Sequence, residues 1–191
     1  RQIRAAQRNY CTGYGDVGFH GNDATLALRR PAKQPTASVE GKVRPLEANF
    51  SAPISYYQPP GNPLLIGLMG ALRAAHYEKK TGLYFLQPYD PDRIPVVFVH
   101  GLISTPFDWV KTINGLQADP EIRKRYQFWV FAYPTGNPVL YSALRLREEL
   151  ARVDKVYPNH KDYVLVGHSM GGLLSQAQVT NVTRADWEKT L

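Results

Sequence analysis

Three short apolar runs, separated by stretches of helical periodicity, constrain this chain more than any other feature. The runs occupy residues 96–99, 128–133 and 163–166. Continuous apolar runs of this length are typical of strands that are covered on both faces of a parallel sheet. Between the runs, apolar residues recur at spacings of three and four, as on one face of a helix. The alternation predicts an α/β fold with a parallel sheet and right-handed crossovers.

Helix boundaries can also be predicted from the residues between these runs. Ser104 or Thr105 can cap the first intervening helix, Pro106 suits its first position, and the pair at 119–120 is expected to stop it. The second intervening helix is expected to end at Pro158.

The part of the chain before the first run is less regular. Residues 39–50 and 83–86 are predicted to be strands, with a helix over 63–77 between them. Residues 1–38 lack periodicity and contain a Pro-rich stretch, so we expect an irregular segment and linker there. Residues 39–191 are then expected to form the N-terminal part of one α/β domain.

Composition limits the classes of function. The chain has 191 residues, 23 Lys and Arg against 16 Asp and Glu, and a net charge of +7. The cations do not alternate with aromatic residues along a stripe, so we expect no nucleic-acid partner. Cys11 is the single cysteine, which leaves neither an internal disulfide nor a thiolate metal site. No apolar run reaches the length of a transmembrane helix.

The cellular location is left open by these features. The chain begins at Arg1 rather than Met, which is compatible with a removed upstream targeting segment. The cell envelope or secretion is therefore favoured over the cytoplasm as an expectation.

A G-x-S-x-G pentapeptide follows the third run directly. It comprises Gly167, Ser169 and Gly171 with His168 and Met170 between them. A serine on a sharp strand-to-helix turn has its hydroxyl lifted out of the sheet, and that turn requires small residues two positions before and after it. The pattern therefore predicts a nucleophilic serine at the start of a helix, whose dipole favours developing negative charge.

A second turn is predicted at the end of the first run. His100 and Gly101 follow that strand, and Gly101 permits a tight bend. Acyl transfer requires two N–H donors for the oxyanion, one of them on the residue after the nucleophile, here Met170. Leu102 is the best candidate for the second donor.

At these residues the sequence resembles the α/β-hydrolase superfamily, specifically bacterial lipase-like and esterase-like serine hydrolases, over about residues 83–179. The resemblance implies that Ser169 is the nucleophile and that the backbone N–H groups of Leu102 and Met170 form the oxyanion hole. It implies ester hydrolysis without a cofactor or metal. The supporting turns would be those of His100, Gly101, Gly167 and Gly171.

The chain departs from that family in one respect. In such hydrolases an Asp or Glu and then a His follow the serine, whereas no His follows Ser169 here. The five histidines all precede it, at positions 20, 76, 100, 160 and 168. We therefore expect C-terminal strands to be absent from this chain, and the His and acid to come from a missing C-terminal region or a second chain. Those strands would lie beside residues 163–166.

Several residues near the predicted site also have structural interpretations. His168 is expected to point away from the reaction, His100 to organise its loop, and Asp108 to cap a helix. The helix at 63–77 is expected to be buried against the sheet rather than to form a lipid-facing patch. The leading hypothesis is an esterase or lipase for a small-molecule or lipid ester. An acyltransferase and a non-catalytic hydrolase-like binding protein remain the alternatives.

Overall fold

The computed structural model describes residues 61–181 continuously, together with Gln34, Gly41 and four short strands nearer the N-terminus. Strands β1 (Tyr14–His20) and β2 (Asp23–Arg29) pair antiparallel, as do β3 (Thr36–Val39) and β4 (Lys42–Pro45). The segment expected to be irregular therefore contains a strand pair, because backbone pairing between two short strands does not require an alternating apolar pattern. The predicted strand at 39–50 is interrupted by the turn at Gly41 between β3 and β4, and its residues 40 and 46–50 lie outside the described residues.

The main sheet has four strands in the order β5-β7-β6-β8. They are β5 (Gly82–Phe85), β6 (Ile94–Val99), β7 (Tyr126–Ala132) and β8 (Val164–Gly167). The last three are parallel, and β5 runs antiparallel to β7. The predicted parallel strands are confirmed to within two residues at their ends. The α/β fold is confirmed, with a mixed rather than wholly parallel sheet.

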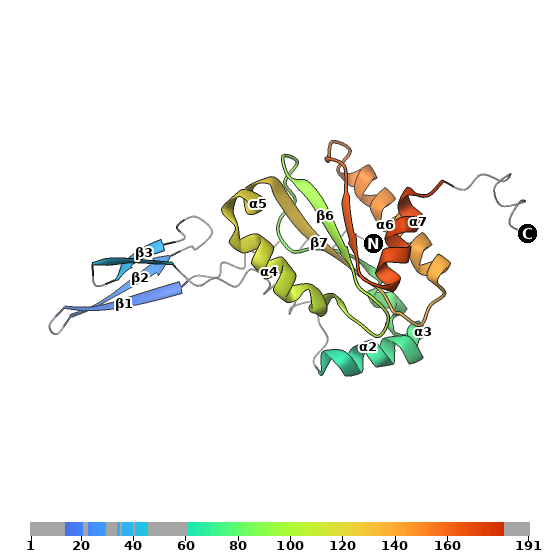
Figure 1. Cartoon of the computed structure of the whole chain (residues 1–191), viewed down its shortest axis with the longest axis horizontal. Coiled ribbons are helices and arrows are strands. Elements are labelled where there is room, and N and C mark those ends of the chain that lie inside the picture. Colours follow the sequence, from blue (N-terminus) through green and yellow to red (C-terminus); the bar gives the residue numbers. More distant parts are fainter. Residues whose placement is uncertain are drawn as a thin grey trace, which may run out of the picture.

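Helices cover both faces of this sheet (Figure 1). One face carries α4 (Val110–Ala118), and the opposite face carries α6 (Val139–Val156) and α7 (Met170–Val179), which pack against each other. A 3-10 turn, η2 (Pro106–Trp109), leads into α4. Each connection between parallel strands therefore crosses the sheet through a helix, as the alternating pattern requires.

The predicted stop at 119–120 separates two helices. Asp119 ends α4, and its carboxylate accepts hydrogen bonds from the backbone N–H groups of Glu121 (2.8 Å) and Ile122 (3.4 Å). Pro120 is then the first residue of α5 (Pro120–Arg125). A proline is tolerated there because the first helical N–H has no intrahelical acceptor in any case. The expectation of a simple helix stop was therefore incomplete.

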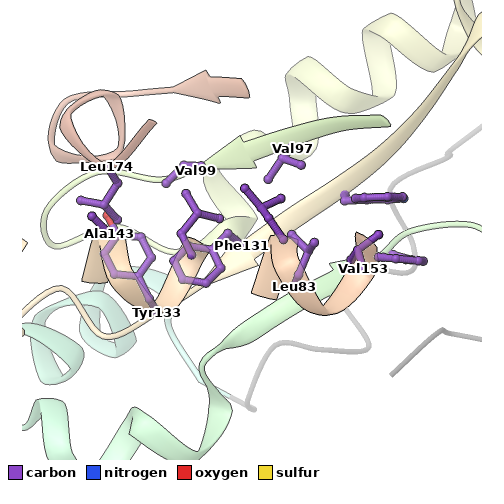
Figure 2. Packing of buried hydrophobic residues seen from close by; sticks show 12 residues of the cluster. Leu83, Val97, Val99, Phe131, Tyr133, Ala143, Val153 and Leu174 are labelled. Atoms are coloured by element: carbon purple, nitrogen blue, oxygen red, sulfur yellow. The ribbon is translucent and has the colours of Figure 1, made fainter. Parts of the chain in front are cut away.

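The larger of two hydrophobic clusters lies between the sheet and the α6–α7 face. Leu174 of α7, Ala143 of α6 and Val99 of β6 lie close together there (Figure 2). Phe85 and Trp129, which face each other across β5 and β7, stack with ring centroids 4.1 Å apart. Burial of these aromatic side chains fixes the register of the strands, since a shift by one residue would move them to the other face.

The predicted helix at 63–77 is divided at Arg73 into α2 (Pro63–Leu72) and α3 (Ala74–Tyr77). Helix α2 buries Gly67 and Gly70 and exposes four leucines, namely Leu64, Leu65, Leu68 and Leu72. A methyl group at Gly67 would lie 2.6 Å from the carbonyl oxygen of Ile103. The expectation that this helix is buried against the sheet is wrong, because it packs through its glycines and turns its leucines outward.

Strand β8 lies at the edge of the sheet, with β6 as its one neighbour among the described strands. Its residues are exposed or half-buried, and Val164 retains 42% of its accessible surface. The interpretation of 163–166 as an apolar strand is confirmed, whereas coverage on both faces does not hold in this chain, where the strand is an exposed edge. An exposed apolar edge of this kind is open to pairing with a further strand.

Across the described parts of the chain, no helix combines the length and apolar character that crossing a membrane would demand.

Candidate active site

Ser169 occupies the turn between β8 and α7. Its backbone has φ 54° and ψ −124°, and its side chain is exposed. A positive φ is uncommon for a residue other than glycine and marks a strained backbone. The N–H groups of Gly171 and Gly172 donate to the carbonyl oxygens of His168 (2.9 Å) and Ser169 (2.8 Å), which closes the turn. The surrounding structure thus holds the serine in a conformation that it would not adopt alone.

Two of the three glycines in this turn are required by close approach. A methyl group at Gly171 would overlap the carbonyl oxygen of Val99 and lie 2.6 Å from that of His100. One at Gly167 would overlap the carbonyl oxygen of Gly171 and lie 2.6 Å from the nitrogen of Gly172. A methyl group at Gly172, in contrast, would find its nearest neighbour at 3.9 Å. Close packing therefore does not require a glycine at position 172.

The two turns predicted from sequence meet at the carboxyl end of the sheet. A methyl group at Gly101 would lie 3.1 Å from Cβ of Ser169 and 3.0 Å from Nδ1 of His168. The backbone N–H of His168 also donates to the carbonyl oxygen of Val99 at 3.1 Å. Adjacent parallel strands β6 and β8 end side by side, so residues about 68 positions apart come into contact.

The two backbone N–H groups predicted for an oxyanion hole donate no hydrogen bond within the described residues. Neither Leu102 nor Met170 donates its backbone N–H to any acceptor among the described residues. Met170 is the first residue of α7, where N–H groups have no intrahelical partner. Their convergence on one point beside Ser169 stays a prediction.

The loop that carries Leu102 is held from two sides. Ile103 has φ 55°, and its backbone N–H donates to Oγ1 of Thr135 at 3.2 Å. On its other side, the carbonyl of Ile103 faces Gly67 of α2 at a distance that leaves no room for a side chain. The loop therefore adopts a second strained backbone conformation next to the serine turn.

His100 is a buried residue within this loop and retains 2% of its accessible surface. Its Nδ1 lies 3.1 Å from the carbonyl oxygen of Gly101, and its ring stacks on that of Tyr133 with centroids 4.4 Å apart. Burial lowers the pKa of His100 to about 4, although the Gly101 carbonyl and the Asp108 carboxylate favour the charged form. The imidazole is therefore neutral near pH 7, and its contacts are those of a group that organises the loop.

Tyr133 is a site residue that sequence reasoning noted only as the end of a strand. Its hydroxyl donates to the carbonyl oxygen of His100 at 2.6 Å, and burial raises its pKa. The sequence signal was the aromatic residue at the strand end, but its partner lies 33 positions away. Only the pairing of β6 with β7 brings the two together.

Asp108 caps η2. Its carboxylate accepts hydrogen bonds from the Ser104 hydroxyl and from the backbone N–H of Thr105 (3.2 Å). The Thr105 hydroxyl in turn accepts from the N–H of Phe107 at 3.3 Å, which completes a capping box. The prediction that Asp108 caps a helix is confirmed.

Among the described residues, His160 and Asp154 form a His and acid pair at the end of β8 opposite to Ser169. Nε2 of His160 lies 2.8 Å from Oδ1 of Asp154, and the Tyr163 hydroxyl donates to the same oxygen at 2.6 Å. Burial and this carboxylate raise the pKa of Tyr163. Tyr163 precedes β8, whereas Ser169 follows it, so the whole strand separates this pair from the serine. Sequence reasoning did not identify the cluster.

The side chain of Ser169 has no hydrogen-bond partner within the described residues. The same part of the chain contains no group of three His, Cys, Asp or Glu side chains able to hold a metal ion. The site therefore contains an exposed serine with a strained backbone at the N-terminus of α7. Two backbone N–H groups without acceptors among the described residues lie on the two adjacent turns. An oxyanion formed by attack on a carbonyl carbon would be stabilised by these two N–H groups only if they converge on one point.

Residues 96–186 match the model of the alpha/beta hydrolase family. No curated protein and no solved structure matches the chain. The matched segment begins in β6 and includes both turns of the site.

Proposed function

We propose, from the premise that residues 96–186 belong to the alpha/beta hydrolase family, that the chain carries the nucleophile of a serine hydrolase that cleaves carboxylic esters. The observation that supports this most directly is the strained backbone of Ser169 between β8 and α7. A serine with only a structural role would have no reason to combine φ at 54° with an exposed side chain. A small-molecule or lipid ester is the proposed substrate.

The reaction uses Ser169 for covalent catalysis. Oγ attacks the ester carbonyl carbon and loses its proton, and the carbonyl oxygen becomes an oxyanion. The N–H groups of Leu102 and Met170 donate to this oxygen, aided by the positive end of the α7 dipole. Collapse of the intermediate expels the alcohol, which takes up a proton. Water then attacks the acyl-enzyme, releases the acid and restores the hydroxyl.

The general base must come from outside the described residues under this proposal. Serine is a poor nucleophile at neutral pH without an adjacent base. His100 is buried and neutral, and the imidazole of His160 is bound to Asp154 at the far end of β8. A parallel strand added beside β8 would end next to Ser169 and could carry the His and acid there. The exposed edge of β8, with Val164 uncovered, supports this placement.

The proposal can be tested by chemical rescue of the missing base. A fluorophosphonate probe is incubated with the chain with and without added imidazole, and the site of labelling is identified by peptide mass spectrometry. We expect slow labelling of Ser169 that imidazole accelerates. An oxyanion hole and substrate binding alone retain about 10³ to 10⁴-fold of rate enhancement over water.

Two variants control this experiment. Ser169→Ala should abolish the labelling, whereas Ser175→Ala should leave it unchanged, because Ser175 lies in the same helix and its hydroxyl donates to the carbonyl oxygen of Gly171 (2.8 Å). Equal labelling of the wild type and Ser169→Ala would refute the assignment. No labelling of Ser169 under any condition would favour the non-catalytic alternative.

An acyltransferase would use the same nucleophile and differ in the acceptor. Product analysis after addition of an activated ester and an alcohol distinguishes the two, because a transferase yields a new ester and a hydrolase yields the free acid.

A further inference from the structure

Helix α2 presents an apolar face to solvent on the outside of the molecule (Figure 1). Its four leucines retain between 39% and 72% of their accessible surface, namely Leu64, Leu65, Leu68 and Leu72. At about 100° of rotation per residue, all four fall within a sector of about 100° around the helix axis. The buried Gly67 and Gly70 lie outside this sector. The four leucines therefore form one stripe, the α2 leucine face.

The packing of the fold does not account for the α2 leucine face. Helix α2 meets the domain through Gly67, where a methyl group would lie 2.6 Å from the carbonyl oxygen of Ile103. A helix attached through a glycine could carry polar residues on its outer side without loss of packing. Leucine side chains held in water are instead unfavourable, and a grouped apolar surface usually marks contact with a partner or a membrane.

The charges that follow the α2 leucine face are mainly of one sign. Three cations with exposed side chains come shortly after Leu72, namely Arg73, Lys79 and Lys80. Glu78 is the one acid in residues 61–80, and its carboxylate lies 3.4 Å from Nε of Arg145. None of the three cations forms an ion pair with a described carboxylate. The segment thus combines an apolar face with uncompensated positive charge.

This combination fits an anionic lipid surface better than a protein partner. A standard protein–protein interface buries about 800 Å² per partner through about 20 to 30 residues, far more than a stripe of four leucines. The rim of such an interface is polar, whereas α2 has no hydroxyl, amide or charged side chain. A lipid surface requires neither feature. Apolar side chains enter the boundary between headgroups and acyl chains, and nearby cations attract anionic headgroups.

We propose that the α2 leucine face docks the chain onto an anionic lipid surface, with Arg73, Lys79 and Lys80 directed toward the headgroups. The contact is peripheral, because α2 has 10 residues and a membrane span needs about 20. Since α2 packs on the loop that carries Leu102, docking would bring this loop close to the lipid. The proposal concerns binding and does not depend on the activity proposed for Ser169.

The test measures sedimentation of the chain with unilamellar vesicles of ether-linked lipids. These lipids contain no ester, so binding is separated from any hydrolysis. Vesicles of phosphatidylcholine and phosphatidylglycerol in equal parts are compared with vesicles of phosphatidylcholine alone. Each cation near an anionic surface contributes about fivefold in affinity, so we expect about 100-fold stronger binding to the anionic vesicles. Salt at about 1 M should remove most of this difference, because it shortens the screening length to about 3 Å.

Substitutions in the segment separate the apolar from the charged contribution. Leu65→Gln and Leu72→Gln each remove an exposed apolar side chain and should weaken binding to the anionic vesicles about fivefold. Arg73→Gln and Lys79→Gln should weaken that binding by a similar factor and leave binding to phosphatidylcholine vesicles unchanged. Circular dichroism checks that each variant is folded. If one leucine variant fails to fold, the other decides.

Two matched controls lie at the other end of the sheet. Val156→Gln removes an exposed apolar side chain and Lys155→Gln an exposed cation, both in the last turn of α6. Helix α6 leads from the carboxyl end of β7 to the start of β8, so its last turn is remote from the Ile103 loop on which α2 packs. Neither control should change vesicle binding, although both alter the composition of the surface.

Three results would overturn the proposal. The first is vesicle binding that the leucine substitutions leave unchanged, or that the two α6 controls weaken equally, since the net charge alone would then explain it. The second is no vesicle binding together with a lower apparent mass of Leu72→Gln than of the wild type in analytical ultracentrifugation, which would make the α2 leucine face an interface between copies of the chain. The third is neither vesicle binding nor a change in apparent mass, which would assign the face to a different protein.

Discussion

The Tyr133 hydroxyl donates a hydrogen bond of 2.6 Å to the carbonyl oxygen of His100, and the two rings stack at an interplanar angle of 19°. This pair joins the end of β7 to the end of β6 directly beneath the turn that contacts Ser169. Both side chains are buried, so the hydrogen bond has no competing water. The pair fixes the course of the backbone from which the Leu102 loop departs.

Tyr133→Phe should destabilise the chain by about 1 to 3 kcal/mol, because the buried carbonyl of His100 loses its partner. Urea unfolding followed by circular dichroism measures this change. Tyr126→Phe is the matched control on the same strand, since the hydroxyl of Tyr126 has no partner among the described residues. Equal destabilisation by the two substitutions would argue against a structural role for the Tyr133 hydrogen bond.

The buried imidazole of His100 should make stability depend on pH. Its pKa is about 4 in the folded chain against an ordinary 6.5, so between these values the unfolded chain binds a proton that the folded chain does not. The free energy of unfolding therefore falls as pH is lowered from about 6.5 to 4, by up to a few kcal/mol. His100→Phe should lose this component. The measurement is the difference in unfolding free energy between wild type and variant at pH 7 and pH 4.5, and a difference independent of pH would contradict the prediction.

Gly171→Ala should prevent the native turn from forming, because its methyl group would overlap the carbonyl oxygen of Val99. We expect a loss of several kcal/mol, or no folding, as for other severe steric conflicts with backbone. Gly172→Ala is the control and should be neutral or slightly stabilising, since its methyl group has room and alanine favours a helix. Thermal denaturation measures the melting temperature of both variants. Equal melting temperatures would contradict the prediction.

Leu102→Pro removes the backbone N–H proposed for the oxyanion hole. The imidazole-assisted rate of fluorophosphonate labelling at Ser169 should fall by about 10²-fold or more, whereas Leu102→Ala, which keeps the N–H, should change it little. The side chain of Leu102 is exposed, which limits its structural effect. The circular dichroism spectrum of the proline variant checks that the fold is retained. Equal labelling rates for Leu102→Pro and Leu102→Ala would contradict the assignment of the Leu102 N–H to the oxyanion hole.

The edge of β8 should drive association of the chain. Val164→Lys places a charge on this edge and should lower the apparent mass of the concentrated chain in analytical ultracentrifugation. Val179→Lys is the control, because Val179 is exposed at the end of α7, away from the edge. If Val164→Lys leaves association unchanged, the association occurs through another surface, such as the exposed leucines of α2.

The elements of the matched segment could be predicted because their signals are local. Strands β6, β7 and β8 each coincide with a continuous apolar run, and α6 follows a clear helical period. The strand pair β1–β2 and the division of the helix at Arg73 were not predicted. Neither is visible in an apolar pattern, since one is a pairing between two backbones and the other is a departure of the Arg73 backbone (φ −132°, ψ 53°) from helical values.

By itself, the sequence determined the α/β fold, the position of the serine turn and the capping role of Asp108, because periodicity, glycine spacing and capping act within a few residues. The tertiary structure decided which segments meet. It placed Gly101 against Ser169, joined Tyr133 to His100, left Nε2 of His100 without a hydrogen-bond partner among the described residues and turned the leucines of α2 outward. These relationships depend on the order of strands in the sheet, which is set by burial summed over the whole chain and is not encoded in any short segment.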